Sequence, residues 1–319
     1  MNHKIYGLVA AVHTPMHEDG QINFDVIEKQ AELLIEQNVS GAFVCGSTGE
    51  ASSLTIGERK AILQRWCDVS NHQLSIIAHV GQTNVNDVWE LARHASGLNV
   101  DAISTTGPVV HQPQTTDELI RYCNIVAKAA HDKPLYYYHS PNVISSNVSL
   151  IDFLIQAKNK IPNLAGVKFN DQDFCLYQRC ASLFNGYFDI PFATDELLLS
   201  ALSYGASGAV GSLYNYVAEI FHRLHSAYKL NDMHNARLIS LRILDIVDIL
   251  KRFGVLASGK KMMLLHDIDC GPPRMPVSPV PENVIESLLE DITSIIEDTC
   301  SLPVTDDATF LCNTYGKEK

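Results

Sequence analysis

Short apolar runs rich in β-branched residues alternate along the chain with longer segments of helical apolar spacing. Several of the runs are apolar nearly throughout, as expected of strands that are buried on both faces. Repeated alternation of strand and helix predicts a closed parallel (β/α)8 barrel, a TIM barrel. The eight predicted strands are Ile5–Val12, Gly41–Cys45, Leu74–Val80, Val100–Ser104, Pro134–His139, Leu164–Phe169, Ile190–Thr194 and Ser207–Gly211. Predicted helices between them include Phe24–Gln37, Ile56–Val69, Val85–Ser96 and Thr116–Ala130.

The alternative to a barrel is an open, doubly wound sheet. Such a sheet usually carries a glycine-rich phosphate loop after its first strand. Here His13-Thr14-Pro15 occupies that position, which favours the barrel. The helix after the second strand has a legible start, because Thr55-Ile56-Gly57-Glu58 has the T-x-x-E form of a capping box.

The chain turns helical after the last predicted strand. We expect residues 1–215 to form the barrel and residues 216–301 to pack on it as additional helices, with 302–319 as a loose polar tail. Gly271–Pro276 holds three prolines and is predicted to be a loop. The additional helices are predicted at Ile220–Leu230, Asn235–Arg252 and Val284–Ile296.

Composition excludes several classes of partner and location. The formal charge is −12, from 24 basic and 36 acidic residues, which argues against a nucleic acid or an anionic membrane as partner. No apolar run reaches the length of a transmembrane helix, and the N-terminus lacks the apolar core of a signal peptide. The eight cysteines form no C-x-x-C pair, so we expect reduced thiols and a cytoplasmic protein.

Barrel enzymes place their working residues at the carboxyl ends of the strands. The second strand ends in Gly46-Ser47-Thr48-Gly49-Glu50, where backbone N–H groups and two hydroxyls can converge on a carboxylate. A plain tight turn is the alternative for this loop. The fifth strand ends in Tyr136-Tyr137-Tyr138-His139, and alternation sends Tyr136 and Tyr138 to one face and Tyr137 to the other. Core packing is the alternative for each tyrosine.

The sixth strand carries the most informative residue, Lys168, whose strand neighbours are all apolar. Lysine is rarely buried without a partner. Burial lowers the pKa of an amine, so part of it is neutral and nucleophilic near neutral pH, as a Schiff-base lysine must be. A lysine at a strand tip that reaches into water is the alternative. Asp195-Glu196 and Ser212 follow the last two strands, although adjacent acids often only cap a helix.

Five landmarks between Ile5 and Pro276 occur in one order. They are G-S-T-G-E at Gly46–Glu50, L-T-x-x-E-R at Leu54–Arg59, Tyr138 with Pro141, G-V-K at Gly166–Lys168, and G-A-x-G-x-x-G-S at Gly205–Ser212. Together they resemble the pyruvate-dependent class I aldolases, the family that includes dihydrodipicolinate synthase. The runs Y-Y-Y-H, G-x-K-F, D-E-x-L-L-S-A-L and G-P-P-R-x-P are most similar to the branch that cleaves N-acetylneuraminate in animals.

The resemblance implies a reaction and a role for each matching residue. Lys168 would form the imine with pyruvate or open-chain sialic acid, Tyr138 would move the proton, and Ser47 and Thr48 would hold the carboxylate, with Thr48 in the relay. The reaction would cleave N-acetylneuraminate, a sialic acid, to N-acetylmannosamine and pyruvate without a cofactor or metal, in a homotetramer. The residues expected to line the sugar site are Asn170, Ala193, Asp195, Glu196 and Ser212.

Three positions depart from the family pattern. Ala193 stands where glycine is usual, Asn170 where threonine or serine is usual, and Val109-Val110-His111 where an aromatic residue is common. The run after Tyr138 lacks the arginine of the synthase branch. Two alternatives stay open: an aldolase for another 2-keto-3-deoxy sugar acid or for hydroxy-oxoglutarate, and a non-catalytic barrel. A metal-dependent barrel hydrolase would need a histidine cluster after the first strand, where only His13 stands.

Overall fold

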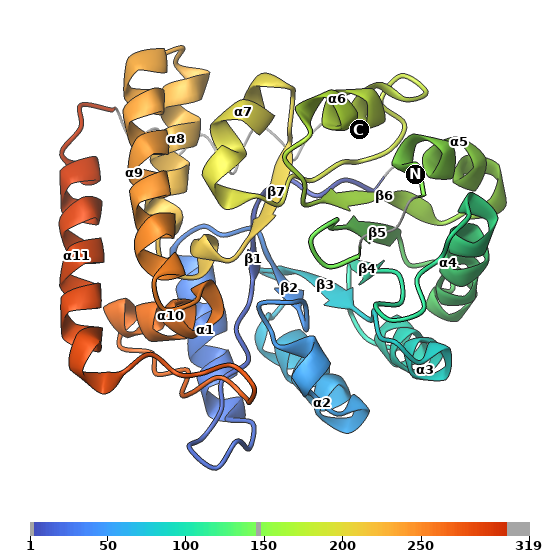
Figure 1. The fold of residues 1–319 in the computed structure, drawn as a ribbon, viewed down its shortest axis with the longest axis horizontal. Coiled ribbons are helices and arrows are strands. Elements are labelled where there is room, and N and C mark those ends of the chain that lie inside the picture. Colours follow the sequence, from blue (N-terminus) through green and yellow to red (C-terminus); the bar gives the residue numbers. More distant parts are fainter. Residues whose placement is uncertain (1–2, 145–147, 305–319) are drawn as a thin grey trace.

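A curled parallel sheet forms the centre of the computed structural model, which describes residues 3–144 and 148–304. Its seven strands follow the order β6-β5-β4-β3-β2-β1-β7, so each strand from β1 to β6 pairs with the next one in the sequence, β1 also pairs with β7, and β6 and β7 are the two edges. Figure 1 shows the strands at the centre of the helices. The strands are β1 (Gly7–Ala11), β2 (Gly41–Val44), β3 (Ser75–His79), β4 (Ala102–Thr105), β5 (Leu135–His139), β6 (Leu164–Phe169) and β7 (Gly208–Gly211).

The sheet closes through the segment predicted as the seventh of eight strands, Ile190–Thr194. This prediction was wrong in detail, because the segment forms isolated bridges rather than a regular strand. It still joins both edges: Phe169 donates its N–H to Pro191 O at 2.9 Å, and Phe192 donates to Gly208 O at 3.1 Å. Pro191 has no N–H to donate, which interrupts the ladder. The predicted (β/α)8 barrel is therefore confirmed, with one irregular wall.

Helices cover the outside of the barrel, one after most strands (Figure 1). Three of the four predicted inter-strand helices have the predicted bounds, and the first ends one residue earlier. The capping box is present: Glu58 N–H donates to Thr55 Oγ1 at 3.2 Å, and Thr55 N–H donates to Glu58 Oε2 at 2.8 Å. These helices are α1 (Phe24–Glu36), α2 (Ile56–Val69), α3 (Val85–Ser96), α4 (Thr116–Ala130), α5 (Leu150–Lys160), α6 (Phe174–Ser182) and α7 (Leu198–Ser203).

Strand alternation divides the buried side chains into two cores. The larger core lies between the strands and the helices. The smaller core fills the barrel interior and includes Phe43, Ile77, Tyr136 and Tyr138. Tyr137 belongs to the outer core, with its ring centroid 5.1 Å from that of Phe153. The predicted division of the tyrosines between two faces is confirmed, and Tyr138 points into the barrel.

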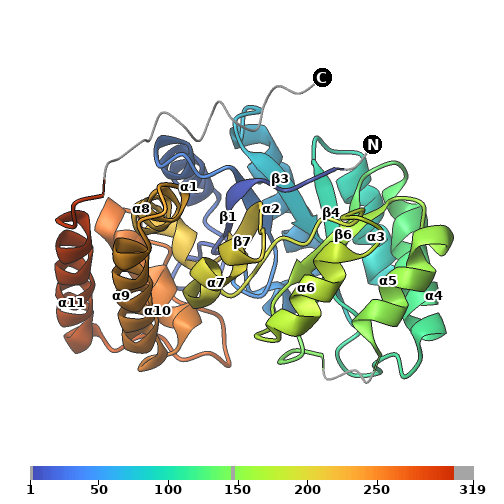
Figure 2. The ribbon, with the colours of Figure 1, turned by 90° about the horizontal axis from the view of Figure 1, so that it is seen from above.

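Four further helices gather at one side of the barrel, where Figures 1 and 2 show them beside α1 and α7. They are α8 (Ala218–Lys229), α9 (Met233–Lys251), α10 (Val255–Met262) and α11 (Glu282–Cys300). The predicted loop Gly271–Pro276 contains no helix. Of the predicted loose tail, 302–319, the structure describes only Leu302–Val304, and 305–319 lie outside the described residues. Within the described part of the chain, no helix has the length and apolarity needed to span a bilayer.

Candidate active site

Lys168 lies on β6 inside the carboxyl end of the barrel and is 4 % exposed. Its ammonium lies 3.7 Å from the centre of the Tyr138 ring and 5.0 Å from that of Phe43. The alternative of a lysine that reaches into water is therefore excluded. Aromatic faces stabilise the cation while they exclude water from it. An amine held in this way is available for chemistry with a carbonyl group that enters from the open end of the barrel.

Tyr138 faces Lys168 across the pairing of β5 with β6. Its side chain is 5 % exposed, and Asn170 Nδ2 lies 3.5 Å from its hydroxyl oxygen. Burial alone would raise the pKa of Tyr138, but the charge of Lys168 and hydrogen bonds with Lys168, Ser47 and Ser140 lower it below its ordinary value. A phenol whose anion is stabilised in this way is a plausible acceptor and donor of protons.

The loop after β2 lies beside the Tyr138 hydroxyl. A hydrogen bond with the Ser47 side chain is among the contacts that lower the pKa of Tyr138. Ser47 is exposed and Thr48 is half-buried. Glu50 N–H donates to Ser47 O at 3.0 Å, which closes a tight turn. Cys45 and Glu50 bracket the turn in the left-handed backbone region, with φ of 56° each. The loop thus places two hydroxyls and the backbone groups of Ser47 and Thr48 next to Tyr138, which itself faces Lys168.

Asp195, predicted to face the sugar, is a buried acceptor for the turn that follows β7. Its Oδ2 accepts the N–H of Ser212 at 2.9 Å and of Leu213 at 3.0 Å, and lies 3.4 Å from Ser212 Oγ. Its Oδ1 has no hydrogen-bond partner in the part of the chain that the structure describes, and it lies against Gly211, where any side chain would collide with it. Burial raises the pKa of Asp195 to about 6. Asp195 therefore fixes the position of Ser212.

Glu196 differs from its neighbour, because its half-buried carboxylate lies towards the end of α9. Lys251 Nζ is 3.6 Å from Glu196 Oε1. Asn170 is held by two contacts: its Nδ2 donates to Ser140 Oγ at 3.1 Å, and its Oδ1 accepts from Thr194 Oγ1 at 3.3 Å. The side chains predicted to line the sugar site thus follow β6, the irregular segment and β7, which are neighbours in the barrel wall.

The remaining departures from the family pattern lie at the surface or at the rim. Ala193 is half-buried, and its N–H donates to Phe169 O at 2.8 Å. The backbone of Ala193 is therefore hydrogen-bonded to the residue that follows Lys168 on β6. Val109 and Val110 are exposed in the loop between β4 and α4.

Sequence reasoning missed two polar residues of the barrel interior, His79 on β3 and Ser104 on β4. The His79 ring centroid lies 5.9 Å from that of Tyr138 and 5.6 Å from that of Phe43. Burial, followed by the charges of Arg59 and Lys168, lowers the pKa of His79 well below its ordinary value. Within the described residues, His79 Nδ1 and Ser104 Oγ have no hydrogen-bond partner. Period-two alternation along the predicted strands could have shown that both residues face inward.

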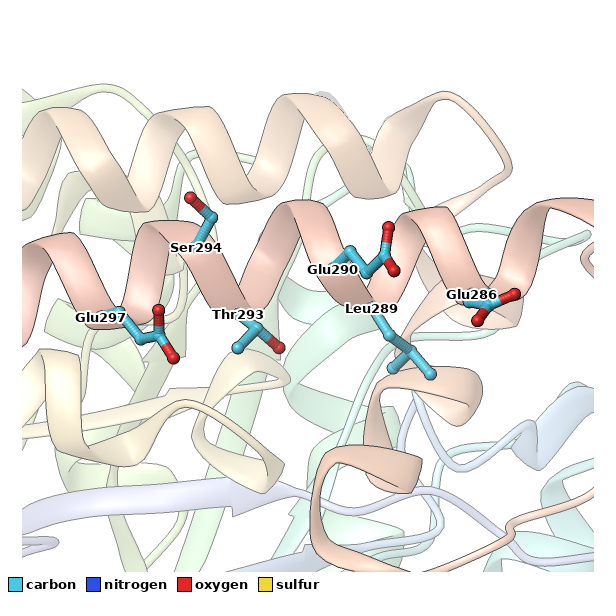
Figure 3. Close-up of a pocket in the computed structure, with 6 residues that line it drawn as sticks. All are labelled: Glu286, Leu289, Glu290, Thr293, Ser294 and Glu297. Atoms are coloured by element: carbon cyan, nitrogen blue, oxygen red, sulfur yellow. The ribbon is translucent and has the colours of Figure 1, made fainter.

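Two hollows of the structure lie away from Lys168 and Tyr138. One, of about 330 Å³, follows the outer surface of α11 and is lined by residues of that single helix, with Glu286, Glu290 and Glu297 along it (Figure 3). The other, of about 740 Å³, opens at the amino ends of the strands, near Gly7 and Ser75. Neither hollow is lined by Lys168, Tyr138, Ser47 or Thr48. Among the described residues, no group of three histidine, cysteine or acidic side chains could hold a metal ion.

The fold and the site together define a (β/α)8 barrel with a strand lysine enclosed beside a tyrosine and a hydroxyl-bearing loop. A model of the dihydrodipicolinate synthetase family matches residues 4–295. The chain is 37% identical over 279 residues to N-acetylneuraminate lyase of Mus musculus, covering 86% of this chain and 87% of that protein. The chain therefore belongs to the dihydrodipicolinate synthetase family, as the sequence landmarks predicted.

Solved structures agree with this assignment. The N-acetylneuraminate lyase, or sialic acid aldolase, of Aliivibrio salmonicida is 41% identical with a TM-score of 0.90, covering 92% of this chain and 97% of that one. A Ruminococcus gnavus sialic acid aldolase solved as a catalytic lysine mutant is 25% identical with a TM-score of 0.88, covering 94% and 99%.

Proposed function

We propose that the protein is a class I aldolase that reversibly cleaves N-acetylneuraminate to N-acetylmannosamine and pyruvate. The observation that carries the proposal is the burial of Lys168 against Tyr138 at the carboxyl end of β6. The names of the Mus musculus and Aliivibrio salmonicida relatives support this substrate. The Ruminococcus gnavus relative, described as a catalytic lysine mutant, supports a lysine mechanism.

The first half of the reaction uses Lys168 as nucleophile. Its neutral amine adds to the C2 carbonyl of open-chain N-acetylneuraminate. The hydroxyl of the resulting carbinolamine takes a proton from the Tyr138 phenol and leaves as water, which gives a protonated imine and the Tyr138 phenolate. The substrate carboxylate lies against Ser47 and Thr48, whose hydroxyl and backbone N–H groups donate to it. The imine nitrogen then draws electrons from the neighbouring carbon chain, so that no metal or organic cofactor is needed.

The second half uses Tyr138 as a proton carrier, with Thr48 in the relay. The Tyr138 phenolate takes the proton of the C4 hydroxyl, and the C3–C4 bond breaks. N-acetylmannosamine leaves as the aldehyde, while the bond electrons form an enamine on Lys168. Protonation of the enamine at C3 gives the pyruvate imine, and water releases pyruvate from Lys168. The lowered pKa of Tyr138 suits both proton steps.

The sugar chain would lie over the residues that follow β6, the irregular segment and β7. We propose that Asn170, Glu196 and Ser212 contact its hydroxyl groups, with Ala193 in the wall. Asp195 would act mainly through the backbone of Ser212 and Leu213, which it holds. This division of roles between the two adjacent acids refines the expectation that both face the sugar.

A substrate panel tests the proposed function against its closest alternative. Purified enzyme is assayed for pyruvate release from N-acetylneuraminate, from other 2-keto-3-deoxy sugar acids and from 4-hydroxy-2-oxoglutarate. The highest kcat/KM is expected for N-acetylneuraminate. Far higher kcat/KM for another acid would favour the alternative aldolase, and no release from any of them would favour a non-catalytic barrel.

We further propose a cytoplasmic homotetramer that needs no metal, with 1–215 as the barrel unit and 216–301 as the helices packed on it. The seven cysteines among the described residues are free thiols, which suits a reducing compartment. Light scattering tests the tetramer, and activity after dialysis against a chelator tests the metal. A dimer, or activity lost to the chelator and restored by a metal, would contradict these proposals.

A further inference from the structure

Glu50, the last residue of the G-S-T-G-E loop, forms a buried ion pair with a helix that is far away in the sequence. Glu50 Oε1 lies 3.0 Å from Lys260 Nζ on α10, and the two side chains are 1% and 0% exposed. A buried charge destabilises a protein unless its partner and its hydrogen bonds are complete. Such a pair at the end of a loop proposed to bind substrate therefore needs an explanation.

All three donors of the Lys260 ammonium are used. Besides Glu50, they reach Thr14 O at 2.9 Å and Pro272 O at 2.7 Å. The other oxygen of Glu50 accepts the N–H of Arg274 at 2.7 Å. The buried ion pair and its hydrogen bonds thus connect three segments: the segment after β1, the loop after β2 and the Gly271–Pro276 loop.

A further hydrogen bond connects this ion pair, through Thr14, to the backbone of the G-S-T-G-E loop. Thr14 Oγ1 donates to Gly49 O at 2.7 Å. His13, the residue before Thr14, is also buried, and burial, followed by the charge of Lys260, lowers the pKa of His13 to about 3. Lys260 is therefore connected to the loop at two adjacent residues, to Gly49 through Thr14 and to Glu50 directly.

Arg274 forms a second set of contacts with the chain segments that flank the same loop. The Arg274 guanidinium donates to Gly20 O at 2.6 Å and to Ser53 O at 2.8 Å, and forms an ion pair with Glu58. The side-chain hydrogen bond from Arg274 lowers the pKa of Glu58 to about 2. The C-terminal segment thus contacts the chain on both sides of the loop, through Lys260 and through Arg274.

We propose that Glu50 and Lys260 are positioning residues, which set the Ser47–Thr48 backbone at the place where it binds the substrate carboxylate. This inference rests on the proposed function, since it takes that loop as the carboxylate site. It makes α10 and the Gly271–Pro276 loop part of the active-site support. Neither Glu50 nor Lys260 contacts substrate, so loss of the pair should weaken recognition of the carboxylate more than it weakens attack by Lys168.

The test compares pyruvate with methyl pyruvate, which keeps the ketone but lacks the anionic carboxylate. Borohydride trapping at increasing ligand concentration gives a half-saturating concentration for each. The variant is Glu50→Gln with Lys260→Met, which removes both charges and leaves no buried charge alone. Thr14→Val, which keeps both charges and removes only the bond to Gly49 O, is the milder second variant. Arg223→Met is the matched control, because Arg223 is also a buried cation of the C-terminal layer and donates to Leu302 O at 2.6 Å.

The double variant should raise the half-saturating concentration of pyruvate about ten- to a hundredfold, since small displacements of a positioning group are costly. Methyl pyruvate should change much less, Thr14→Val should show a smaller change in the same direction, and Arg223→Met should alter neither ligand selectively. If the double variant does not fold, Thr14→Val decides the question alone. Equal changes for both ligands, or no change in a folded variant, would overturn the inference. Absence of any pyruvate adduct at Lys168 in the wild type would instead remove the proposed function, and this inference with it.

Discussion

The Lys168 ammonium lies 3.7 Å from the centre of the Tyr138 ring, on neighbouring strands of the barrel. A cation and an ionisable phenol that are both buried influence each other strongly, because the surrounding protein screens their interaction poorly. The charge of Lys168 therefore lowers the pKa of Tyr138 against the effect of burial. In the proposed mechanism this one pair of residues supplies both the nucleophile and the proton carrier that imine chemistry requires.

Tyr138→Phe tests the proton carrier. The change removes the hydroxyl and keeps the ring against Lys168. We expect kcat for N-acetylneuraminate cleavage to fall about 10²–10⁴-fold, the usual contribution of one positioned acid–base group. Trapping of pyruvate by borohydride should survive in part, because Lys168 remains.

Tyr137→Phe is the matched control, since Tyr137 is the next residue and faces the outer core against Phe153. Its kcat should stay near that of the wild type. Near-normal kcat in Tyr138→Phe would show that Tyr138 only packs the core and that another group moves the proton.

Glu196→Gln tests the sugar site. A hydrogen bond to a charged group contributes about 1.5–3 kcal/mol, so kcat/KM for N-acetylneuraminate should fall about ten- to a hundredfold. Pyruvate trapping at Lys168 should be unchanged, and a short aldol substrate without the outer hydroxyls should lose less. Equal losses on both substrates would mean that Glu196 supports the loop and does not contact the sugar.

Asp195→Ala should behave differently from Glu196→Gln, because Asp195 is an internal acceptor. The variant leaves the N–H groups of Ser212 and Leu213 without their partner, at a cost of about 1–3 kcal/mol of stability. We expect a lower Tm and losses on both the long and the short substrate. An unchanged Tm, with loss on the long substrate alone, would show that Asp195 acts directly on the sugar.

Asp189 makes stability depend on pH. Burial raises the pKa of Asp189 to about 6, although Ile5 N–H and the Tyr136 hydroxyl donate to it at 2.7 and 2.8 Å. The folded state therefore holds the proton more tightly than the unfolded state, whose aspartate pKa is about 4. Its contribution to stability is complete below about pH 4 and is lost as the pH rises through about 6.

Asp189→Asn removes this titration and keeps an acceptor oxygen. Urea unfolding at pH 5 and pH 7 should show a smaller fall in the free energy of unfolding with rising pH than in the wild type. Asp132→Asn, at an exposed carboxylate, is the control and should follow the wild type. An identical pH dependence in Asp189→Asn and the wild type would contradict the assignment.

The barrel was predictable because its signal is repeated: each buried strand and each amphipathic helix repeats the same alternation. The irregular segment at Ile190–Thr194 was predicted as a strand because its apolar pattern is that of a strand, while the effect of one missing N–H at Pro191 depends on its neighbours in the sheet. The division of Tyr136, Tyr137 and Tyr138 between two faces followed from the period of two along the strand, and the burial of Lys168 followed from its apolar strand neighbours.

The rest of the site depends on contacts between segments far apart in the sequence. Asp195 was predicted to face the sugar, and nothing local in the sequence shows that the backbone N–H groups of Ser212 and Leu213 would donate to its carboxylate. Lys260 carried no signal at all, because its partners Glu50 and Thr14 lie more than two hundred residues away along the chain. Long-range pairing of this kind is set by the packing of the whole fold, and no local pattern encodes it.

The most direct measurement of the central claim is mass spectrometry of the protein after treatment with pyruvate and borohydride. We predict one reduced pyruvate adduct for each chain, on Lys168, and none on the buried Lys260. Lys168→Arg, whose guanidinium stays protonated and cannot act as the nucleophile, should give no adduct and no turnover. An adduct on another lysine, or a wild-type enzyme that cleaves N-acetylneuraminate without any adduct, would contradict the account.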